Sequence, residues 1–248
     1  MQTIDLNCDM GEGFANDAQL MPWISSVNIA CGYHAGDADS MQRTLALAIE
    51  HQLAIGAHPG FADKANFGRT EVLLPLNEVF DLVITQVQLL QQMAVDMGAR
   101  LNHVKPHGAL YNMSARDALL ANTIAKAVYT VDSELVLFGL SGSHSISEAE
   151  KIGLRTASEV FADRTYQPNG SLTPRSAANA LIGSEEECLQ QVLQMIEQKT
   201  VTATNQQAVP IVADTVCLHG DGEHALDFAR AIFHKLQQHR IQIQPLAH

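Results

Sequence analysis

Reactive side chains are concentrated in six short segments of this chain, each of which directly follows or overlaps an apolar stretch. The segments span residues 5–12, 28–37, 56–60, 103–108, 159–164 and 217–221. Carboxylates, imidazoles and a lysine gathered in one place can move protons, bind an anion or hold a metal ion. Because six such segments follow one another, we expect successive strand ends to converge on one site. That arrangement is typical of a β/α barrel, whose active-site face lies at the C-terminal strand ends.

Alternation along a strand predicts which of these side chains point the same way. The residues that share a face are Asp5, Asn7 and Asp9 in the first segment, His103, Lys105 and His107 in the fourth, Glu159, Phe161 and Asp163 in the fifth, and Cys217, His219 and Asp221 in the last. We expect the polar members to point towards the barrel mouth. Apolar neighbours such as Ile4, Leu6, Val104 and Val160 would then face the surrounding helices.

Asp9 is the best candidate for a general base or a metal ligand, because a carboxylate at the end of a buried strand has a tunable pKa. The alternative is a turn aspartate that caps Gly11. Asn7 and Glu12 lie close to it in the sequence and are predicted to contact the substrate. Glu12, within Gly-Glu-Gly, could also be a solvated turn residue.

His34 and His58 each follow a strand and lie near a glycine. Together with Asp9 they are similar to the Asp/His/His set of a metal hydrolase. The three residues are dispersed along the chain and show no HxxxH or HExxH spacing, so we expect functional roles without a metal for both histidines. The alternative is that they form hydrogen bonds to neighbouring loops, and metal dependence of the protein stays open.

Lys105 and His107 form the most specific pair in the sequence. A lysine inside a barrel strand is costly unless an anion compensates its charge, so Lys105 could bind a substrate carboxylate, a phosphoryl group or a developing oxyanion. The alternative is a structural ion pair with Asp5, Asp9 or Glu159. His107 could transfer a proton or form a hydrogen bond to the following turn. The predicted catalytic residues are Asp9, His58, Lys105, His107 and Asp163.

The stretch from Asp163 to Arg175 has no hydrophobic periodicity and is long enough to cover a site as a lid. Arg164 could bind an anion there, with Arg175 as a weaker candidate, although either could be a surface residue. Near the last strand, His219 and Asp221 would complete the ring of polar groups. The predicted substrate-binding residues are Asn7, Glu12, His34, Arg164, His219 and Asp221.

Strands that alternate with helices must position these segments. Short apolar or β-branched runs predict buried strands near 2–8, 26–31, 53–57, 101–106, 135–139, 155–161 and 214–219. Helices are predicted near 38–51, 77–98, 115–131, 143–152, 174–181, 184–198 and 223–239. This alternation predicts an α/β fold, namely a single-domain, seven-stranded β/α barrel over residues 1–248. A doubly wound open sheet is the alternative.

Composition narrows the classes of partner. The chain has 248 residues, of which 46% are hydrophobic, and a formal net charge of −12. That charge argues against binding to nucleic acid or an anionic membrane, but permits a small anionic substrate held by a few cationic side chains. The N-terminal residues lack the pattern of a signal peptide and the four cysteines show no CxxC pairing. We therefore expect reduced thiols in a cytoplasmic protein.

Taken together, the motifs resemble the lactam-utilisation (LamB/YcsF) family over essentially the whole chain. The matching motifs are Asp5-x-Asn7-x-Asp9-x-Gly11-Glu12, Asn28-Ile-Ala-Cys-Gly-Tyr-His34-Ala-Gly-Asp37, Gly56-Ala-His58-Pro, Phe67-Gly-Arg69, His103-Val-Lys105-Pro-His107-Gly-Ala-Leu-Tyr111-Asn112, Glu159-Val-Phe-Ala-Asp163-Arg164 and Val216-Cys-Leu-His219-Gly-Asp221-Gly. The resemblance implies a barrel of the glycoside hydrolase/deacetylase type. It also implies ATP-dependent 5-oxoprolinase activity, in which 5-oxo-L-proline is cleaved to L-glutamate while ATP is hydrolysed to ADP and phosphate. ATP would be bound with Mg²⁺, and the enzyme would be a complex of this chain with subunits B and C.

On this interpretation Lys105 and Arg164 would neutralise the substrate carboxylate or the phosphoryl group. Asp9 would activate water, and His58 or His107 would protonate the leaving nitrogen. The sequence contains no GxxxxGK[ST] phosphate loop, so ATP would bind at a non-standard site in this chain or on a partner subunit. Two alternatives are a metal-dependent deacetylase or amidase of the same barrel type, and a non-catalytic subunit that presents the substrate.

Overall fold

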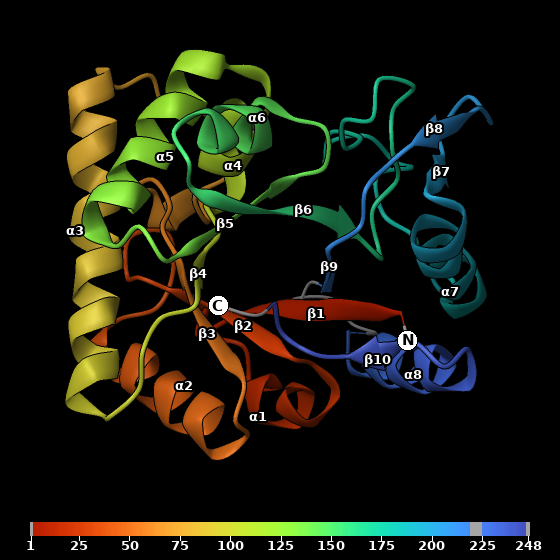
Figure 1. Ribbon diagram of the computed structural model, residues 1–248, viewed down its shortest axis with the longest axis horizontal. Coiled ribbons are helices and arrows are strands. Elements are labelled where there is room, and N and C mark those ends of the chain that lie inside the picture. Colours follow the sequence, from red (N-terminus) through yellow and green to blue (C-terminus); the bar gives the residue numbers. More distant parts are fainter. Residues whose placement is uncertain (1, 219–224, 247–248) are drawn as a thin grey trace.

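The barrel is closed by seven parallel strands within residues 2–218 and 225–246, the parts of the chain that the computed structural model describes (Figure 1). The barrel strands are β1 (Thr3–Met10), β2 (Ser26–Ala30), β3 (Ala54–His58), β4 (His103–Val104), β5 (Val136–Leu140), β6 (Arg155–Phe161) and β9 (Thr215–Leu218). Neighbours in the sequence pair in order, and β9 pairs with both β6 and β1. The predicted seven-stranded β/α barrel is therefore confirmed, and the open doubly wound sheet is wrong.

In the described parts of the chain, three further strands lie outside the ring. β10 (Gln242–Ile243) pairs with the beginning of β1, so the end of the chain is attached to its start. β7 (Thr200–Thr202) and β8 (Ala208–Pro210) form a small antiparallel ribbon. In Figure 1 this ribbon stands beside the barrel above α7 (Glu185–Leu193).

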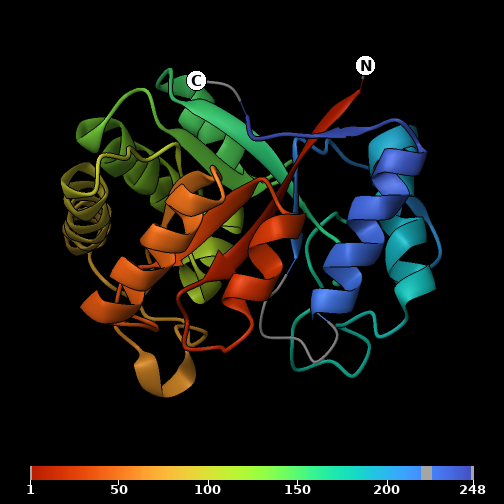
Figure 2. The same cartoon turned by 90° about the horizontal axis from the view of Figure 1, so that it is seen from below.

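Helices cover the outside of the barrel (Figures 1 and 2). The remaining α-helices are α1 (Asp17–Leu20), α2 (Ala38–Glu50), α3 (Leu76–Asp96), α4 (Gly108–Arg116), α5 (Ala118–Val131), α6 (His144–Lys151) and α8 (Ala225–Gln238). On one flank α3 packs against α5, and on the other α7 packs against α8. No helix in the described ranges is both long enough and apolar enough to cross a membrane.

Two helix predictions differ from the structure. The predicted helix over 115–131 is two helices, because the backbone of Asp117 is extended and its side chain caps α5 by accepting from the Leu119 and Leu120 N–H groups. The predicted helix over 174–181 is wrong. That segment forms turns, and its backbone bonds instead to the lid that precedes it, where Thr165 N–H donates to the Ala180 carbonyl.

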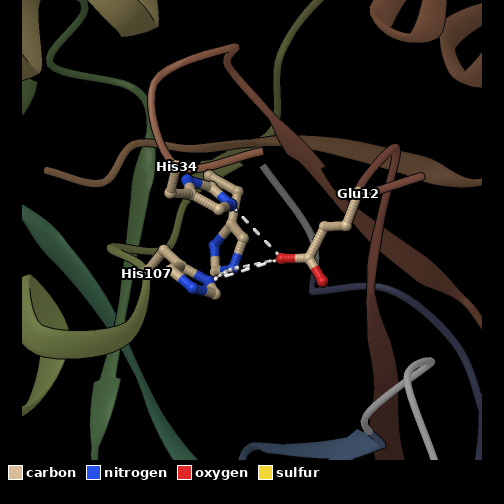
Figure 3. Close-up of side chains that lie close together, drawn as sticks. Glu12, His34 and His107 are labelled. Carbon is tan, nitrogen blue, oxygen red and sulfur yellow. Dashed lines mark hydrogen bonds and ion pairs between the residues drawn. The ribbon is translucent and has the colours of Figure 1, made fainter. Parts of the chain in front are cut away.

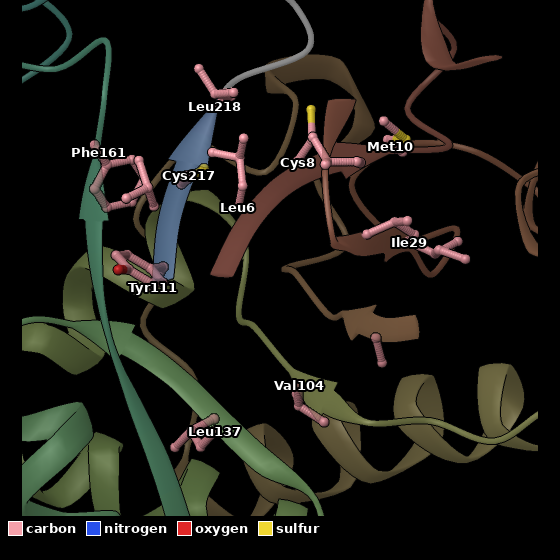
Figure 4. Packing of buried hydrophobic residues seen from close by; sticks show 14 of the residues in the cluster. Leu6, Cys8, Met10, Ile29, Val104, Tyr111, Leu137, Phe161, Cys217 and Leu218 are labelled. Atoms are coloured by element: carbon pink, nitrogen blue, oxygen red, sulfur yellow. The ribbon is translucent and has the colours of Figure 1, made fainter. Parts of the chain in front are cut away.

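Alternation along the strands was predicted correctly. Ile4, Leu6, Val104 and Val160 are buried in the apolar layer between the barrel and its helices, part of which is drawn in Figure 4. Many of the side chains that point into the barrel are polar instead. Asp5, for example, is buried and accepts hydrogen bonds from the hydroxyl groups of residues on β2 and β9. The sheet therefore delivers polar side chains along its axis towards the C-terminal strand ends.

Candidate active site

A cavity of about 490 Å³ opens where the C-terminal ends of the barrel strands meet. Four of the five predicted catalytic residues line it, each supplied by the end of a strand or the turn just after it. These are Asp9, His58, Lys105 and His107. Glu12 and Arg164, predicted to bind substrate, also line the cavity. Strand ends far apart in the sequence thus converge on one space large enough for a small ligand.

Lys105 lies at the bottom of this cavity between two carboxylates. Its Nζ atom is 2.8 Å from Asp9 Oδ1 and 2.8 Å from Glu159 Oε1, and all three side chains are buried. Burial alone would lower the pKa of Lys105, but the charges of Asp9 and Glu159 outweigh burial and hold that pKa well above its usual value. The ion pair that the sequence left as an alternative is therefore present, and the lysine charge is already compensated.

Asp9 is held in place by its neighbours. Its Oδ1 atom accepts from Lys105 Nζ and from Asn28 Nδ2, both at 2.8 Å, while Oδ2 lies 3.4 Å from His58 Nε2. Asn28 in turn donates to Asn7 Oδ1, so β1 and β2 are joined by an amide bridge. One Asp9 oxygen is thus occupied by fixed donors, and the other faces the histidines.

Three histidine rings and one carboxylate converge beside Asp9. His107 Nδ1 is 2.8 Å from His58 Nε2, and the ring of His34 stacks on that of His107 at 3.8 Å between centroids. Glu12 Oε1 lies 3.2 Å from His34 Nε2 and 3.4 Å from His107 Nδ1 (Figure 3). One ligand atom from each of Glu12, His34, His58 and His107 lies within 4.8 Å of all the others. Such a set of nitrogen and oxygen atoms is able to hold a metal ion.

Burial keeps the proton affinity of two of these rings, those of His34 and His107, low. Burial, and next the neighbouring His58, lower the pKa of His34 to about 2. The same two causes, joined by His34, hold the pKa of His107 well below its usual value. At neutral pH His34 and His107 are therefore neutral rings with one lone pair each.

Part of the segment predicted to form a lid, residues 163–175, lines the cavity through Thr173, Pro174 and Arg175. Arg164 is buried and holds the lid together by donating to the backbone carbonyls of Thr173 and Ala180. Burial, followed by the charge of Arg175, lowers the pKa of Arg164 to about 10, so it remains a cation. Arg164 thus has a structural task in addition to facing the cavity.

Several predicted site residues lie elsewhere. Asn7 and His34 are buried behind the described cavity lining, where Asn7 bonds to Glu159 and Thr215. Asp163, predicted to be catalytic, is likewise not part of that lining, and its carbonyl accepts from Ile182 N–H. His219 and Asp221 lie outside the described residues.

The structure adds residues that the sequence prediction of the site omitted. Glu159, which the sequence named only as a partner for Lys105 and not among the site residues, is buried completely against that lysine. The signal for it was an ionisable residue within an otherwise apolar part of β6. The rim of the cavity also carries Arg69 and Arg116, beside Arg175, which the sequence offered as a weaker anion-binding candidate. Arg116 forms an exposed ion pair with Glu71 at 2.6 Å. No local pattern distinguishes these arginines from surface residues, because α4, a turn and the lid bring them together only in the folded chain.

Known proteins with similar sequences and structures match this chain along its length. The LamB/YcsF family model matches residues 4–248. A protein of Tolumonas auensis, named as the A subunit of 5-oxoprolinase, is 51% identical over 251 residues, which cover 99% of this chain and 100% of the relative. The crystal structure of the lactam utilization protein from Thermus thermophilus superposes with a TM-score of 0.93 at 38% identity, covering 99% of this chain and 100% of that one.

A more distant likeness concerns the fold alone. A family 4 carbohydrate esterase from Streptomyces lividans in complex with acetate superposes with a TM-score of 0.54 at 10% identity. The match covers 99% of this chain and 93% of the esterase. The barrel is therefore of the type found in such esterases, as the sequence predicted.

Proposed function

This chain belongs to the LamB/YcsF family, and we propose that it is the A subunit of an ATP-dependent 5-oxoprolinase that opens 5-oxo-L-proline to L-glutamate. A relative of that name, matched over its full length at 51% identity, supports the proposal. The observation that carries it in the structure is the cavity itself, where an aspartate, a buried lysine and two histidines meet below a rim of arginines. Acid–base groups and an anion-binding rim are what the opening of a small carboxylated lactam requires.

The rim suits the carboxylate of 5-oxoproline. Although the whole chain has a formal net charge of −12, the cavity is lined by Arg69, Arg116, Arg164 and Arg175. Arg116 is paired with Glu71, and Arg164 is bound to lid carbonyls. Arg69 lies over the ring of Phe67, 4.8 Å from its centroid. We therefore assign the substrate carboxylate to Arg175, on the lid, and give Arg164 the task of holding the lid in position.

ATP would make an unactivated amide reactive. Transfer of the γ-phosphoryl group to the lactam oxygen releases ADP and leaves an electrophilic carbon bearing a good leaving group. Water adds to that carbon, and the C–N bond breaks as the ring nitrogen takes up a proton. A second water then hydrolyses the resulting acyl phosphate to glutamate and phosphate. A cavity covered by a lid protects these intermediates from bulk water.

The geometry supports a division of roles among the residues on the cavity floor. Asp9 would take the proton from the attacking water, because its Oδ2 atom is the oxygen that does not accept from Lys105 or Asn28. Lys105 would hold Asp9 ionised and neutralise the negative charge of the phosphoryl group that is transferred to the lactam oxygen. The neighbouring pair of His58 and His107 would deliver the proton to the ring nitrogen.

The complex and its location are part of the same proposal. The relative is named as one subunit of an enzyme, which supports a multi-subunit assembly, and we expect subunits B and C to join this chain and to take part in ATP-dependent activation. ATP would arrive with Mg²⁺. The four cysteines are buried free thiols, which is in keeping with the cytoplasm as the compartment of the reaction.

A metal-dependent amidase is the second candidate, because Glu12, His34, His58 and His107 place four ligand atoms together. Glutamate release from 5-oxoproline separates the two functions. The proposal predicts release, with one ADP formed per glutamate, only when this chain, both partner subunits, ATP and Mg²⁺ are present. Release by the chain alone without ATP would establish the amidase instead. No release from the full mixture would reject 5-oxoproline as the substrate.

A further inference from the structure

The tautomers of two histidines in the cavity are fixed by backbone carbonyls. His58 Nδ1 lies 2.6 Å from the carbonyl oxygen of Lys105, and His107 Nε2 lies 2.8 Å from that of Phe67. A carbonyl oxygen can only accept, so each of these nitrogens carries a hydrogen. In the neutral rings, the other nitrogen of each histidine must then present a lone pair.

Those two lone-pair nitrogens face each other. His58 Nε2 and His107 Nδ1 are 2.8 Å apart, a distance at which two acceptors repel unless a positive charge lies between or beside them. The rings cannot turn to relieve the contact without breaking their bonds to the carbonyls. The arrangement therefore calls for a cation at this point, and the cation is either a proton shared by the rings or a bound metal ion.

The distances from Glu12 to the three rings are close to those of a metal site. For zinc with bonds of about 2.1 Å, tetrahedral ligand atoms lie about 3.4 Å apart. The separations of Glu12 Oε1 are 3.2 Å to His34 Nε2, 3.4 Å to His107 Nδ1 and 3.9 Å to His58 Nε2. His34 Nδ1 is buried without a hydrogen-bond partner among the described residues, so no acceptor fixes the tautomer of that ring and Nε2 can also present a lone pair.

The surroundings of the rings favour a metal over a proton. A histidine that binds a metal commonly donates its other N–H group to a backbone carbonyl, as His58 and His107 do here. A proton shared by the two rings would be held by two nitrogens alone. A dication near Glu12 instead gains a carboxylate ligand in a buried place.

We propose that Glu12, His34, His58 and His107 bind a divalent transition metal ion of the zinc type. Three imidazoles and one carboxylate are the donors that such ions prefer, whereas Mg²⁺ and Ca²⁺ prefer oxygen ligands. The site is therefore distinct from that of the Mg²⁺ that accompanies ATP. Because Glu12, His58 and His107 line the cavity, the ion would face the substrate and could polarise its carbonyl oxygen. While it is bound, it would replace the proton that His58 and His107 would otherwise share, so the two rings would act as ligands and not as the acid.

Metal binding to the purified full-length chain tests this proposal without partner subunits, ATP or turnover, so its outcome is independent of the 5-oxoprolinase reaction. After treatment with a chelator, Zn²⁺ and Co²⁺ are titrated in a calorimeter, and the visible spectrum of the Co²⁺ form is recorded. We expect one equivalent per chain and the intense absorption of a tetrahedral Co²⁺ site. The absence of stoichiometric binding of either ion would overturn the proposal.

Variants locate the ion. His107→Gln and Glu12→Gln should each weaken Zn²⁺ binding by more than about tenfold, because even partners beyond the direct ligands are worth about 10- to 100-fold. His144→Gln, on an exposed histidine at the start of α6, is the control and should leave affinity unchanged. If circular dichroism shows that His107→Gln does not fold, the Zn²⁺ affinity of Glu12→Gln still tests the assignment of the ligands. Unchanged affinity and Co²⁺ spectrum in the folded ligand variants would place the ion elsewhere and contradict the assignment.

Discussion

The ammonium group of Lys105 lies 2.8 Å from the carboxylate of Glu159, whose side chain is completely buried. Asp9 supplies the second carboxylate to the same ammonium group. Lys105 therefore balances two buried negative charges and faces the cavity at the same time. Removal of its charge should affect both the fold and the chemistry, so the two effects have to be separated by a second substitution.

Lys105→Met should destabilise the protein by roughly 3–5 kcal/mol, because it leaves Asp9 and Glu159 buried without their cation. The double variant Lys105→Met with Glu159→Gln removes one of the two carboxylates and should recover a large part of that loss without recovering glutamate release. Urea unfolding of the two proteins measures the difference. Equal stability of the single variant and the unmodified chain would show that the buried ion pair is not a net requirement of the fold.

Gly60 should tolerate no side chain, because an added Cβ would lie 2.7 Å from His34 Nδ1. The backbone of Gly60 cannot shift easily, since Gln86 of α3 bonds to both its N–H and its carbonyl. We expect Gly60→Ala to cost about 1–3 kcal/mol of stability and to displace the His34 ring, lowering glutamate release by the complex. Gly183→Ala is the matched control, because nothing lies within 4 Å of its added Cβ. Similar behaviour of the two variants would argue against tight packing around His34.

Acid should destabilise the metal-free protein through its buried histidines. The folded-state pKa of His34 is about 2, against a usual 6.5, so below pH 6.5 the unfolded chain binds a proton that the folded chain does not. The contribution of His34 to stability is therefore fully present above its unfolded pKa. That contribution decreases as the pH is lowered, by about 1.4 kcal/mol for each pH unit well below the unfolded pKa. In the chelator-treated protein, His34→Gln should reduce the slope of unfolding free energy against pH by that amount. The exposed His51→Gln should leave it unchanged, and equal slopes for all three proteins would refute the prediction.

Arg175 should act on substrate binding more than on the fold. If it binds the carboxylate, Arg175→Ala should raise KM for 5-oxoproline by about tenfold or more, which is the value of one charge-assisted hydrogen bond. Arg43→Ala, on the exposed face of α2, removes the same charge away from the cavity and should leave KM unchanged. Equal KM values for the two variants in the assembled complex would move the carboxylate to another part of the rim.

Much of the architecture could be predicted because it follows from local patterns. The alternation of Asp5, Asn7 and Asp9 with apolar residues reflects the two faces of a strand, and it placed these side chains inside the barrel as the structure has them. By contrast, the predicted helix over 174–181 failed because tertiary bonds override weak local preference. The Ala180 carbonyl of this segment accepts hydrogen bonds from the buried guanidinium of Arg164 and from the Thr165 N–H group, so it is not available to a helix.

The details of the site could not be predicted, because they depend on contacts between distant segments. The sequence offered Asp5, Asp9 and Glu159 as partners for Lys105, and only the closed barrel selects Asp9 and Glu159 while hydroxyl groups satisfy Asp5. The tautomer of His107 depends on the carbonyl of Phe67, in a turn whose path no periodicity reveals. The sequence grouped Asp9 with His34 and His58 as a possible metal-binding set. The ligand set that we propose from the structure includes Glu12 in place of Asp9.

The most direct test of the central claim, that the lactam is opened in the cavity of this chain, is glutamate release by the assembled complex carrying Asp9→Asn. This variant keeps the shape of the side chain and the contacts to Asn28 and Lys105 can partly persist, but it removes the base. We predict a loss of glutamate release of at least about 100-fold, with 5-oxoproline still bound and the melting temperature within a few degrees of the unmodified complex. Near-normal glutamate release by a folded Asp9→Asn complex would contradict the account and place the chemistry on another residue or another chain of the complex.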